Sequence, residues 1–107
     1  MENFAHFVKE KLKGIDNNNI VLTDYARRRA AWRQINLAEV YNDLLNPVLL
    51  VWAERQEVEG EERFNCYFVR NRSAYRCILA FENGKVKIIN LIKLLKWQKG
   101  LVKAREK

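Results

Sequence analysis

The chain has 107 residues, of which 49% are hydrophobic and 31% are charged, and its formal net charge is +7 at pH 7. This hydrophobic content, with only one proline and four glycines, excludes a disordered tail and predicts a single folded domain over residues 1–107. No apolar run approaches the length of a membrane span, and the N-terminus lacks the layout of a signal peptide, so we expect a cytoplasmic protein without a membrane partner.

Helical signals dominate the first half of the chain. Hydrophobic residues recur at helical spacing near the N-terminus, Thr23 and Asn36 are typical N-cap residues, and Pro47 ends the last helical pattern. These signals predict helices over residues 2–13, 24–34 and 37–45, and a short extended segment over residues 20–22.

After Pro47 the pattern becomes that of strands, because hydrophobic and polar residues alternate. The predicted strands cover residues 48–53, 63–70, 75–81 and 86–90, with an acidic loop over residues 54–62. From about Lys93 onward, many leucines and lysines predict a basic helix. The predicted fold class is therefore α+β, with N-terminal helices packed on one face of a mainly antiparallel four-stranded sheet and a basic C-terminal helix.

The cysteines and the histidine restrict the chemistry. Cys66 and Cys77 are too few for a disulfide framework and lack the spacing of a metal site. They lie in neighbouring predicted strands with the same alternation, so we expect buried reduced thiols that are close in space. His6 is the only histidine, and no catalytic partner lies near it in the sequence. We therefore expect no His-based triad, no metal and no cofactor.

The excess positive charge is confined to one end of the chain. Residues 1–84 carry equal numbers of basic and acidic side chains, so the whole excess of +7 lies in residues 85–107. Such a segment favours a nucleic acid, an acidic protein surface or simple solubility. The candidate nucleic-acid-binding residues there are Lys93, Lys96, Lys99 and Lys103.

The predicted second helix places two arginines beside its buried edge. At 100° per residue, Arg29 and Arg33 fall between Tyr25 and the small residues of that edge. An arginine there needs a carboxylate, an aromatic face or a phosphate. Either Glu39 or Trp32 satisfies this need structurally, or Tyr25, Arg29 and Arg33 bind an anion such as a nucleic-acid phosphate.

The alternation of the strands also brings charged residues together on one sheet face. If the helices cover the face that carries Phe64 and Cys77, with Val86, Ile88 and Asn90 on the same side, the opposite face carries Arg63, Tyr67, Arg76 and Lys87. Three cations and a phenol can bind a phosphodiester, stabilise the charge that develops during strand cleavage and stack a base.

A structural interpretation of the same face stays open. It also carries an apolar strip, consisting of Val69, Ile78, Ala80 and Ile89, which the C-terminal helix or a partner can cover. In that case Arg63 pairs with the acidic loop.

Residues 25–39 resemble the pattern His-Ala-x-x-Arg-x-x-x-Arg-x-Ile-Ser-x-x-Glu of small uncharacterised domains grouped with the RelE/ParE toxin superfamily. The matching residues are Ala26, Arg29, Arg33, Ile35 and Glu39. Asn36 replaces serine as an equivalent cap, and Tyr25 stands where those domains usually carry histidine. The resemblance extends more loosely through Leu91, in the order of the elements. It implies a RelE-like fold, and RelE-like ribonucleases have arginine, lysine and an aromatic residue on the sheet face.

Three functions follow as expectations. The first is a RelE-like toxin that cleaves messenger RNA through Arg63, Tyr67, Arg76 and Lys87, on the ribosome or free, with a small acidic antitoxin as partner. The second is a module that binds nucleic acid without cutting it. The third is a ParE-type module whose basic face meets a protein. A homodimer is compatible with each.

Overall fold

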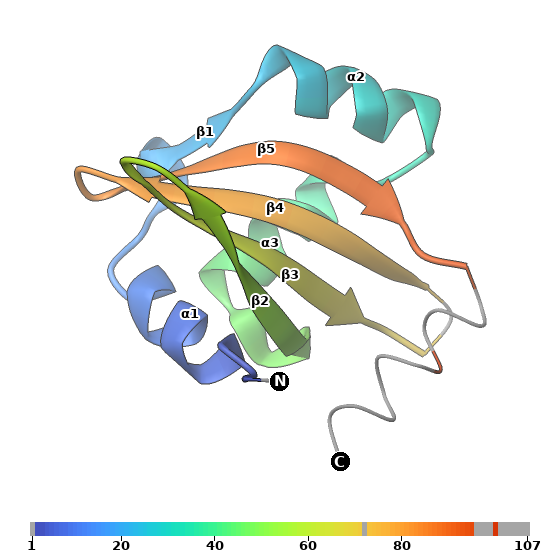
Figure 1. Cartoon of the computed structure of the whole chain (residues 1–107). Coiled ribbons are helices and arrows are strands. Elements are labelled where there is room, and N and C mark those ends of the chain that lie inside the picture. Colours follow the sequence, from blue (N-terminus) through green and yellow to red (C-terminus); the bar gives the residue numbers. More distant parts are fainter. Residues whose placement is uncertain (1, 72, 96–99, 101–107) are drawn as a thin grey trace.

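The computed structural model describes residues 2–71, 73–95 and 100. In chain order the elements are α1 (Ala5–Leu12), β1 (Ile20–Leu22), α2 (Asp24–Trp32), α3 (Leu37–Leu45), β2 (Leu50–Val58), β3 (Glu61–Val69), β4 (Ala74–Glu82) and β5 (Lys85–Lys93) (Figure 1). Short 3₁₀ turns at Asn17–Asn19 and Pro47–Leu49 precede β1 and β2. The predicted α+β class is confirmed.

The sheet has five strands in the order β1-β5-β4-β3-β2. Strands β2 to β5 form an antiparallel meander, whereas β1 pairs with β5 in parallel, Ile20 opposite Val86 and Leu22 opposite Ile88. The prediction of four strands was wrong because β1 has three residues, too few to show an alternation, and its partner lies more than sixty positions away.

The acidic segment over residues 54–62 is not a loop. β2 runs to Val58 and β3 begins at Glu61, so only Glu59 and Gly60 form the turn, where Gly60 has a φ of +74° that glycine adopts without strain. The charged side chains of this hairpin remain at least partly exposed, so their polarity does not oppose a strand.

The other end of the sheet corrects two predictions about β5. The strand continues to Lys93, which pairs with Tyr75, so no helix begins at Lys93. Beyond Leu95 the structure describes only Gly100, which is helical, and the rest of the predicted basic helix lies outside the described residues. The register shifts after Ile88, because Ile78 pairs with Asn90 and Leu79 with Ile88.

This β-bulge reverses the alternation in the last part of β5. Leu91 is completely buried in the main core, whereas Asn90 lies opposite Ile78 on the other face. The prediction that Asn90 follows Val86 and Ile88 onto the helix-covered face was therefore wrong, since a one-residue insertion moves every later side chain to the opposite face.

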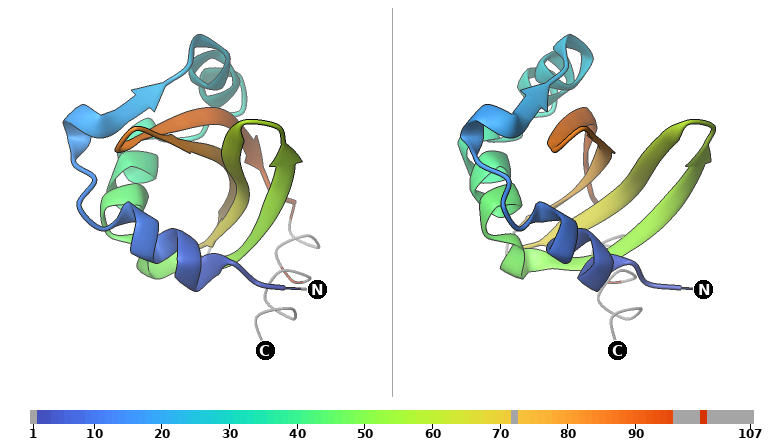
Figure 2. Two further views of the ribbon diagram at one scale, coloured as in Figure 1. Left: turned by 60° about the vertical axis from the view of Figure 1, so that its left-hand side comes forward. Right: turned by 90° about the vertical axis from the view of Figure 1, so that its left-hand side faces the viewer.

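Helices α1 and α3 pack on the same side of the curved sheet, whereas α2 lies beside β5 (Figure 2). The core between α1, α3 and the sheet consists of fully buried side chains such as Val8, Val40, Phe64, Phe68 and Leu79. We call the sheet face opposite α1 and α3 the open face.

Both predicted N-caps are confirmed. Thr23 Oγ1 accepts a hydrogen bond from the Ala26 amide at 3.1 Å and donates one to the Ile88 carbonyl at 2.8 Å. Asn36 Oδ1 accepts from the amides of Ala38 and Glu39. The Thr23 hydroxyl therefore both begins α2 and attaches it to β5.

Within the described ranges, none of the helices combines the length and the apolar character that crossing a membrane requires.

Candidate functional site

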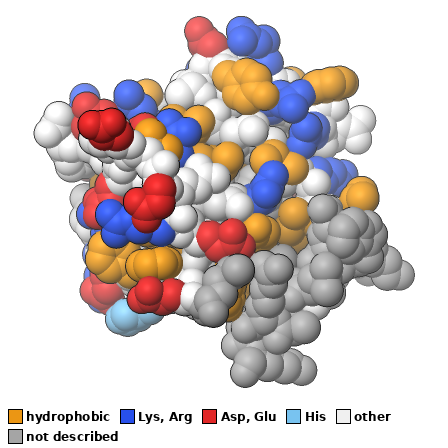
Figure 3. Space-filling model, viewed as in Figure 1, with side chains coloured by type: hydrophobic (Ala, Val, Ile, Leu, Met, Phe, Trp, Pro, Cys, Tyr) orange, Lys and Arg blue, Asp and Glu red, His pale blue; other side chains and the backbone are white. Residues whose placement is uncertain are grey.

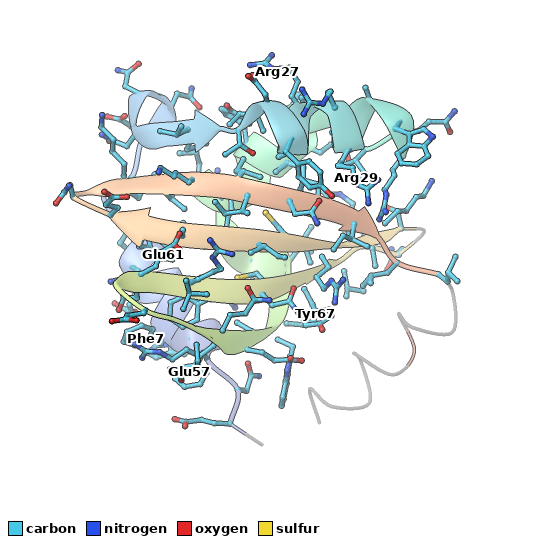
Figure 4. The ribbon with its side chains drawn as sticks, turned by 45° about the horizontal axis from the view of Figure 1, so that its top comes forward. Phe7, Arg27, Arg29, Glu57, Glu61 and Tyr67 are labelled. Atoms are coloured by element: carbon cyan, nitrogen blue, oxygen red, sulfur yellow. The ribbon has the colours of Figure 1, made fainter. Side chains whose placement is uncertain are left out.

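The register brings the four predicted site residues onto the open face. Tyr67 pairs with Arg76, and Arg63 and Lys87 both pair with Ala80 from opposite sides. Figure 4 looks onto this face and shows Tyr67 toward one end of β3 and Glu61 toward the other. The regular alternation of β3 and β4 explains why the sequence pattern placed these side chains correctly.

Tyr67 belongs to a hydrogen-bonded chain of side chains. Its hydroxyl donates to Glu54 Oε1 at 3.3 Å and accepts from Asn65 Nδ2 at 3.1 Å. Trp52 Nε1 donates to the same carboxylate oxygen at 3.2 Å. Glu54 and Asn65 were not among the predicted site residues, because residue 54 was assigned to a loop and Asn65 appeared only as part of the strand alternation.

The cations of this face differ in how they are paired. Arg63 Nη2 contacts Glu61 Oε2 at 2.8 Å, as the structural interpretation expected, and Lys87 Nζ lies 3.6 Å from Glu82. Arg76 forms no ion pair with any residue that the structure describes. The Nε atoms of Arg63 and Arg76 are buried without a hydrogen-bond partner. Two unpaired guanidinium donors therefore lie on one face.

The end of the open face near the β3–β4 turn is packed rather than open. Trp52, Tyr67, Val69 and Ala74 form a small buried cluster, against which Leu94 packs. The Leu94 amide also donates to the Ala74 carbonyl at 2.9 Å. Part of the predicted apolar strip is thus covered. Arg76 pairs with Tyr67 of this cluster, whereas Arg63 lies four residues earlier on β3, opposite Ala80.

Helix α2 presents a second basic surface. The Arg29 guanidinium lies 5.0 Å from the Trp32 ring and 5.4 Å from the Tyr25 ring. Stacking on Trp32 is therefore confirmed, whereas an Arg29 pair with Glu39 was wrong, because Glu39 faces Arg70 at 3.8 Å.

The two aromatic side chains of this surface face solvent, since Trp32 is 74% exposed and Tyr25 47%. Arg33, the C-cap of α2, is half-buried. Figure 3 shows basic side chains gathered beside hydrophobic ones on the side where α2 lies. Exposed rings next to arginines can stack nucleobases.

A second cluster with an arginine, a tyrosine and a carboxylate lies on the helix-covered side. Asp43 of α3 is 1% exposed and accepts hydrogen bonds from Arg70 Nη1 and Nη2 at 2.7 and 2.8 Å and from the Tyr75 hydroxyl at 2.6 Å. Burial raises the pKa of Tyr75, so the hydroxyl stays protonated, and the Asp43 hydrogen bond raises the pKa of Arg70. No sequence pattern was interpreted as this cluster, although an aspartate between Val40 and Leu44 in an apolar stripe was a signal.

The cysteines are confirmed as buried free thiols. Cys66 pairs with Cys77 across β3 and β4, and both are completely buried. Burial raises the pKa of both thiols, which makes them unreactive. His6 lies on the surface of α1, 3.8 Å from Glu10 and apart from the open face. In the described part of the chain, no three His, Cys, Asp or Glu side chains are grouped as metal ligands.

Of the four candidate lysines of the C-terminal segment, only Lys93 can be located. It is exposed at the end of β5. Lys96, Lys99 and Lys103 lie outside the described residues.

Comparison with protein-family models gives no match, and comparisons with curated proteins and with solved structures give no significant match.

Proposed function

We propose that this protein is a RelE/ParE-like toxin-type ribonuclease that binds messenger RNA across the open face and cleaves it. One observation carries the proposal: Arg63 and Arg76, which lie on the same sheet face as Tyr67 and Lys87, each have a buried Nε–H without a hydrogen-bond partner. An unpartnered buried donor destabilises the free protein, and a ligand with strong acceptors removes this penalty. A phosphodiester is such a ligand, because guanidinium groups match its oxygens.

The same groups support cleavage. Arg76 and Lys87 can stabilise the extra negative charge when the ribose 2′-oxygen bonds to phosphorus and the bond to the 5′-oxygen breaks. Glu54, which accepts the Tyr67 hydrogen bond, is the carboxylate best placed to take the proton of the attacking hydroxyl, and Tyr67 or Lys87 can return a proton to the leaving oxygen. With no histidine on the face, we expect slow turnover on free RNA and faster turnover when the ribosome positions the strand.

The order of the elements is one support for the proposal. After α1, the chain continues through β1, the helices α2 and α3 over which the motif extends, and the antiparallel strands β2 to β5. Tyr25, Arg29 and Trp32 extend the proposed binding surface beyond the sheet. Lys96, Lys99 and Lys103, which lie outside the described residues, remain candidate phosphate contacts from the sequence alone. A small acidic antitoxin is the proposed protein partner, since it would neutralise these basic surfaces.

Induced expression in bacteria tests the proposal. The parent chain should arrest growth and create new 5′ ends in messenger RNA, whereas Arg76→Ala/Tyr67→Phe and Glu54→Gln should not. Arg27→Ala, which removes an exposed arginine from α2, is the matched control and should arrest growth like the parent. A folded parent protein that causes neither arrest nor new ends would refute the ribonuclease.

A second candidate is a module that binds nucleic acid without cutting it. The observation that favours it is the position of Tyr67, whose hydroxyl is already engaged by Glu54 and Asn65 and whose side chain is 9% exposed. RNA binding that falls steeply with salt, without cleavage on ribosomes, would select this candidate.

A further inference from the structure

Asn65 has the most unusual environment of the polar residues on the open face. It is 5% exposed, and its Oδ1 is buried without a hydrogen-bond partner. Buried amide oxygens normally accept at least one hydrogen bond, because an unpaired one loses its hydration without compensation. The other end of the amide, Nδ2, donates to Tyr67.

The polarity of the neighbouring groups determines which end of the amide is unpaired. A carboxylate only accepts hydrogen bonds, so the Tyr67 hydroxyl proton points to Glu54. The Tyr67 oxygen must then accept from Asn65, and only Nδ2 can donate. The free end of the side chain is therefore an acceptor, Oδ1, to which no group in the described residues donates.

Asn65, with its unpaired Oδ1, lies between two residues that have unpaired donors, the Nε–H groups of Arg63 and Arg76. Along β3, Asn65 stands between Arg63 and Tyr67, and its partner Ile78 is two residues after Arg76 on β4. Asn65 and Arg76 are thus diagonal neighbours on one face, with Cβ atoms roughly 7 Å apart. A ligand at this place meets two unpaired guanidinium donors and one unpaired acceptor, so it must combine acceptors with a hydroxyl or amino donor a few ångströms away.

We propose that Asn65 Oδ1 accepts a hydrogen bond from a ribose 2′-hydroxyl beside a phosphate held by Arg76, so that Asn65 selects RNA over DNA. The proposal rests on the function proposed above. The hydroxyl belongs to the ribose on the 3′ side of the phosphate, because the one on the 5′ side must lose its proton to attack. Deoxyribose has no donor at this place and leaves Oδ1 unpaired.

The ribose hydroxyl fits better than a base edge. It is attached to the same backbone as the phosphate, so it stays at a nearly constant distance from the arginines whatever the sequence, whereas a base can turn away. Asn65 Oδ1 is buried in the free protein, so a neighbouring side chain must move to admit the ribose, and Arg76 is a diagonal neighbour. No ion pair with a described residue holds Arg76 back.

A comparison of two probes tests the proposal. Fluorescence anisotropy would measure the binding of a short labelled oligouridine and of its 2′-deoxy counterpart, which keeps uracil and removes only the hydroxyls. The probes are checked for cleavage on denaturing gels. The parent should bind the ribose form about tenfold more tightly, as expected for one lost hydrogen bond that leaves a buried acceptor unpaired.

Asn65→Leu, which keeps the branched shape but removes the acceptor together with the Nδ2 donor to Tyr67, should bring the ratio of the two affinities close to one, mainly by weakening binding of the ribose form. Asn65→Ala provides a second variant if leucine disturbs folding. Asn90→Ala is the matched control, because Asn90 lies in the same row of the open face but its Oδ1 already accepts from the Leu91 amide. It should keep the parent ratio.

Three results would overturn the inference. A parent that binds both probes equally has no ribose selection, although RNA binding itself would stand. A folded Asn65→Leu variant that keeps the tenfold ratio shows that another residue selects the ribose. A parent that binds neither probe refutes the proposed function together with this inference.

Discussion

The protein contains two clusters with an arginine, a tyrosine and a carboxylate, and they differ in how completely their hydrogen bonds are made. On the helix-covered side, Arg70 and Tyr75 both donate to Asp43. On the open face, Tyr67 donates to Glu54, whereas Arg76 keeps a buried Nε without a partner. The same side chains stabilise a fold where they satisfy one another and remain available to a ligand where they do not.

Replacement of Asp43 should have the largest effect on stability. Asp43→Ala leaves the buried Tyr75 hydroxyl without its acceptor and the partly exposed Arg70 with only the 3.8 Å contact to Glu39, so the free energy of unfolding should fall by about 3 kcal/mol. Arg76→Ala should change it by less than about 1 kcal/mol, since no pairing is lost. Urea denaturation of the two variants measures both values, and equal losses would mean that the two clusters have the same structural role.

The buried thiols and Tyr75 on the helix-covered side should make folding stability depend on alkaline pH. Burial raises the pKa of Cys66, Cys77 and Tyr75 in the folded protein, so the unfolded chain loses these protons first. These three groups should leave stability unchanged below about pH 8, lower it as the unfolded thiols ionise above about pH 8.5 and lower it more steeply above about pH 10, where the unfolded tyrosine ionises.

Each thiol contributes a slope of about 1.4 kcal/mol per pH unit, or about 2 kcal/mol between pH 8.5 and 10. Thermal unfolding across this range measures the effect. Replacing one cysteine by alanine should reduce the slope of unfolding free energy against pH by the contribution of one thiol, about 1.4 kcal/mol per pH unit. An unchanged slope would show that the thiols do not ionise on unfolding.

Substitutions on the open face should change RNA affinity more than folding stability. Arg76→Ala should weaken oligouridine binding about tenfold or more, because a charged hydrogen bond contributes about 1.5–3 kcal/mol. The slope of log affinity against log salt should decrease by about 0.7 for the lost phosphate contact. Arg55→Ala, on an exposed position of β2, is the control for a general loss of charge. An equal effect of both variants would indicate nonspecific attraction.

The smallest effect is expected on α2. Trp32→Ala should change stability by less than about 0.5 kcal/mol, because Trp32 is 74% exposed, but should weaken RNA binding about fivefold if a base stacks there. Arg29→Lys keeps the charge but loses the planar group that stacks between Tyr25 and Trp32, so its effect should be smaller than that of Trp32→Ala. Unchanged affinity in both variants would limit the RNA surface to the sheet.

Local patterns in the sequence determined the caps at Thr23 and Asn36 and the sides of the sheet on which Tyr67 and Arg76 lie. These features depend on backbone conformation and alternation over a few residues, which neighbouring residues control. Four of the proposed site residues could be grouped on this basis alone.

Long-range contacts, which no local pattern records, set the other features of the fold and the site. The parallel pairing of β1, the bulge after Ile88 and the partners of Asp43 and Glu54 all involve residues far apart in the chain, and no local period records which distant group satisfies a given side chain. The unpaired Oδ1 of Asn65 is the clearest case, because an unsatisfied acceptor is defined by what its surroundings lack, which becomes visible only when the surroundings are in place.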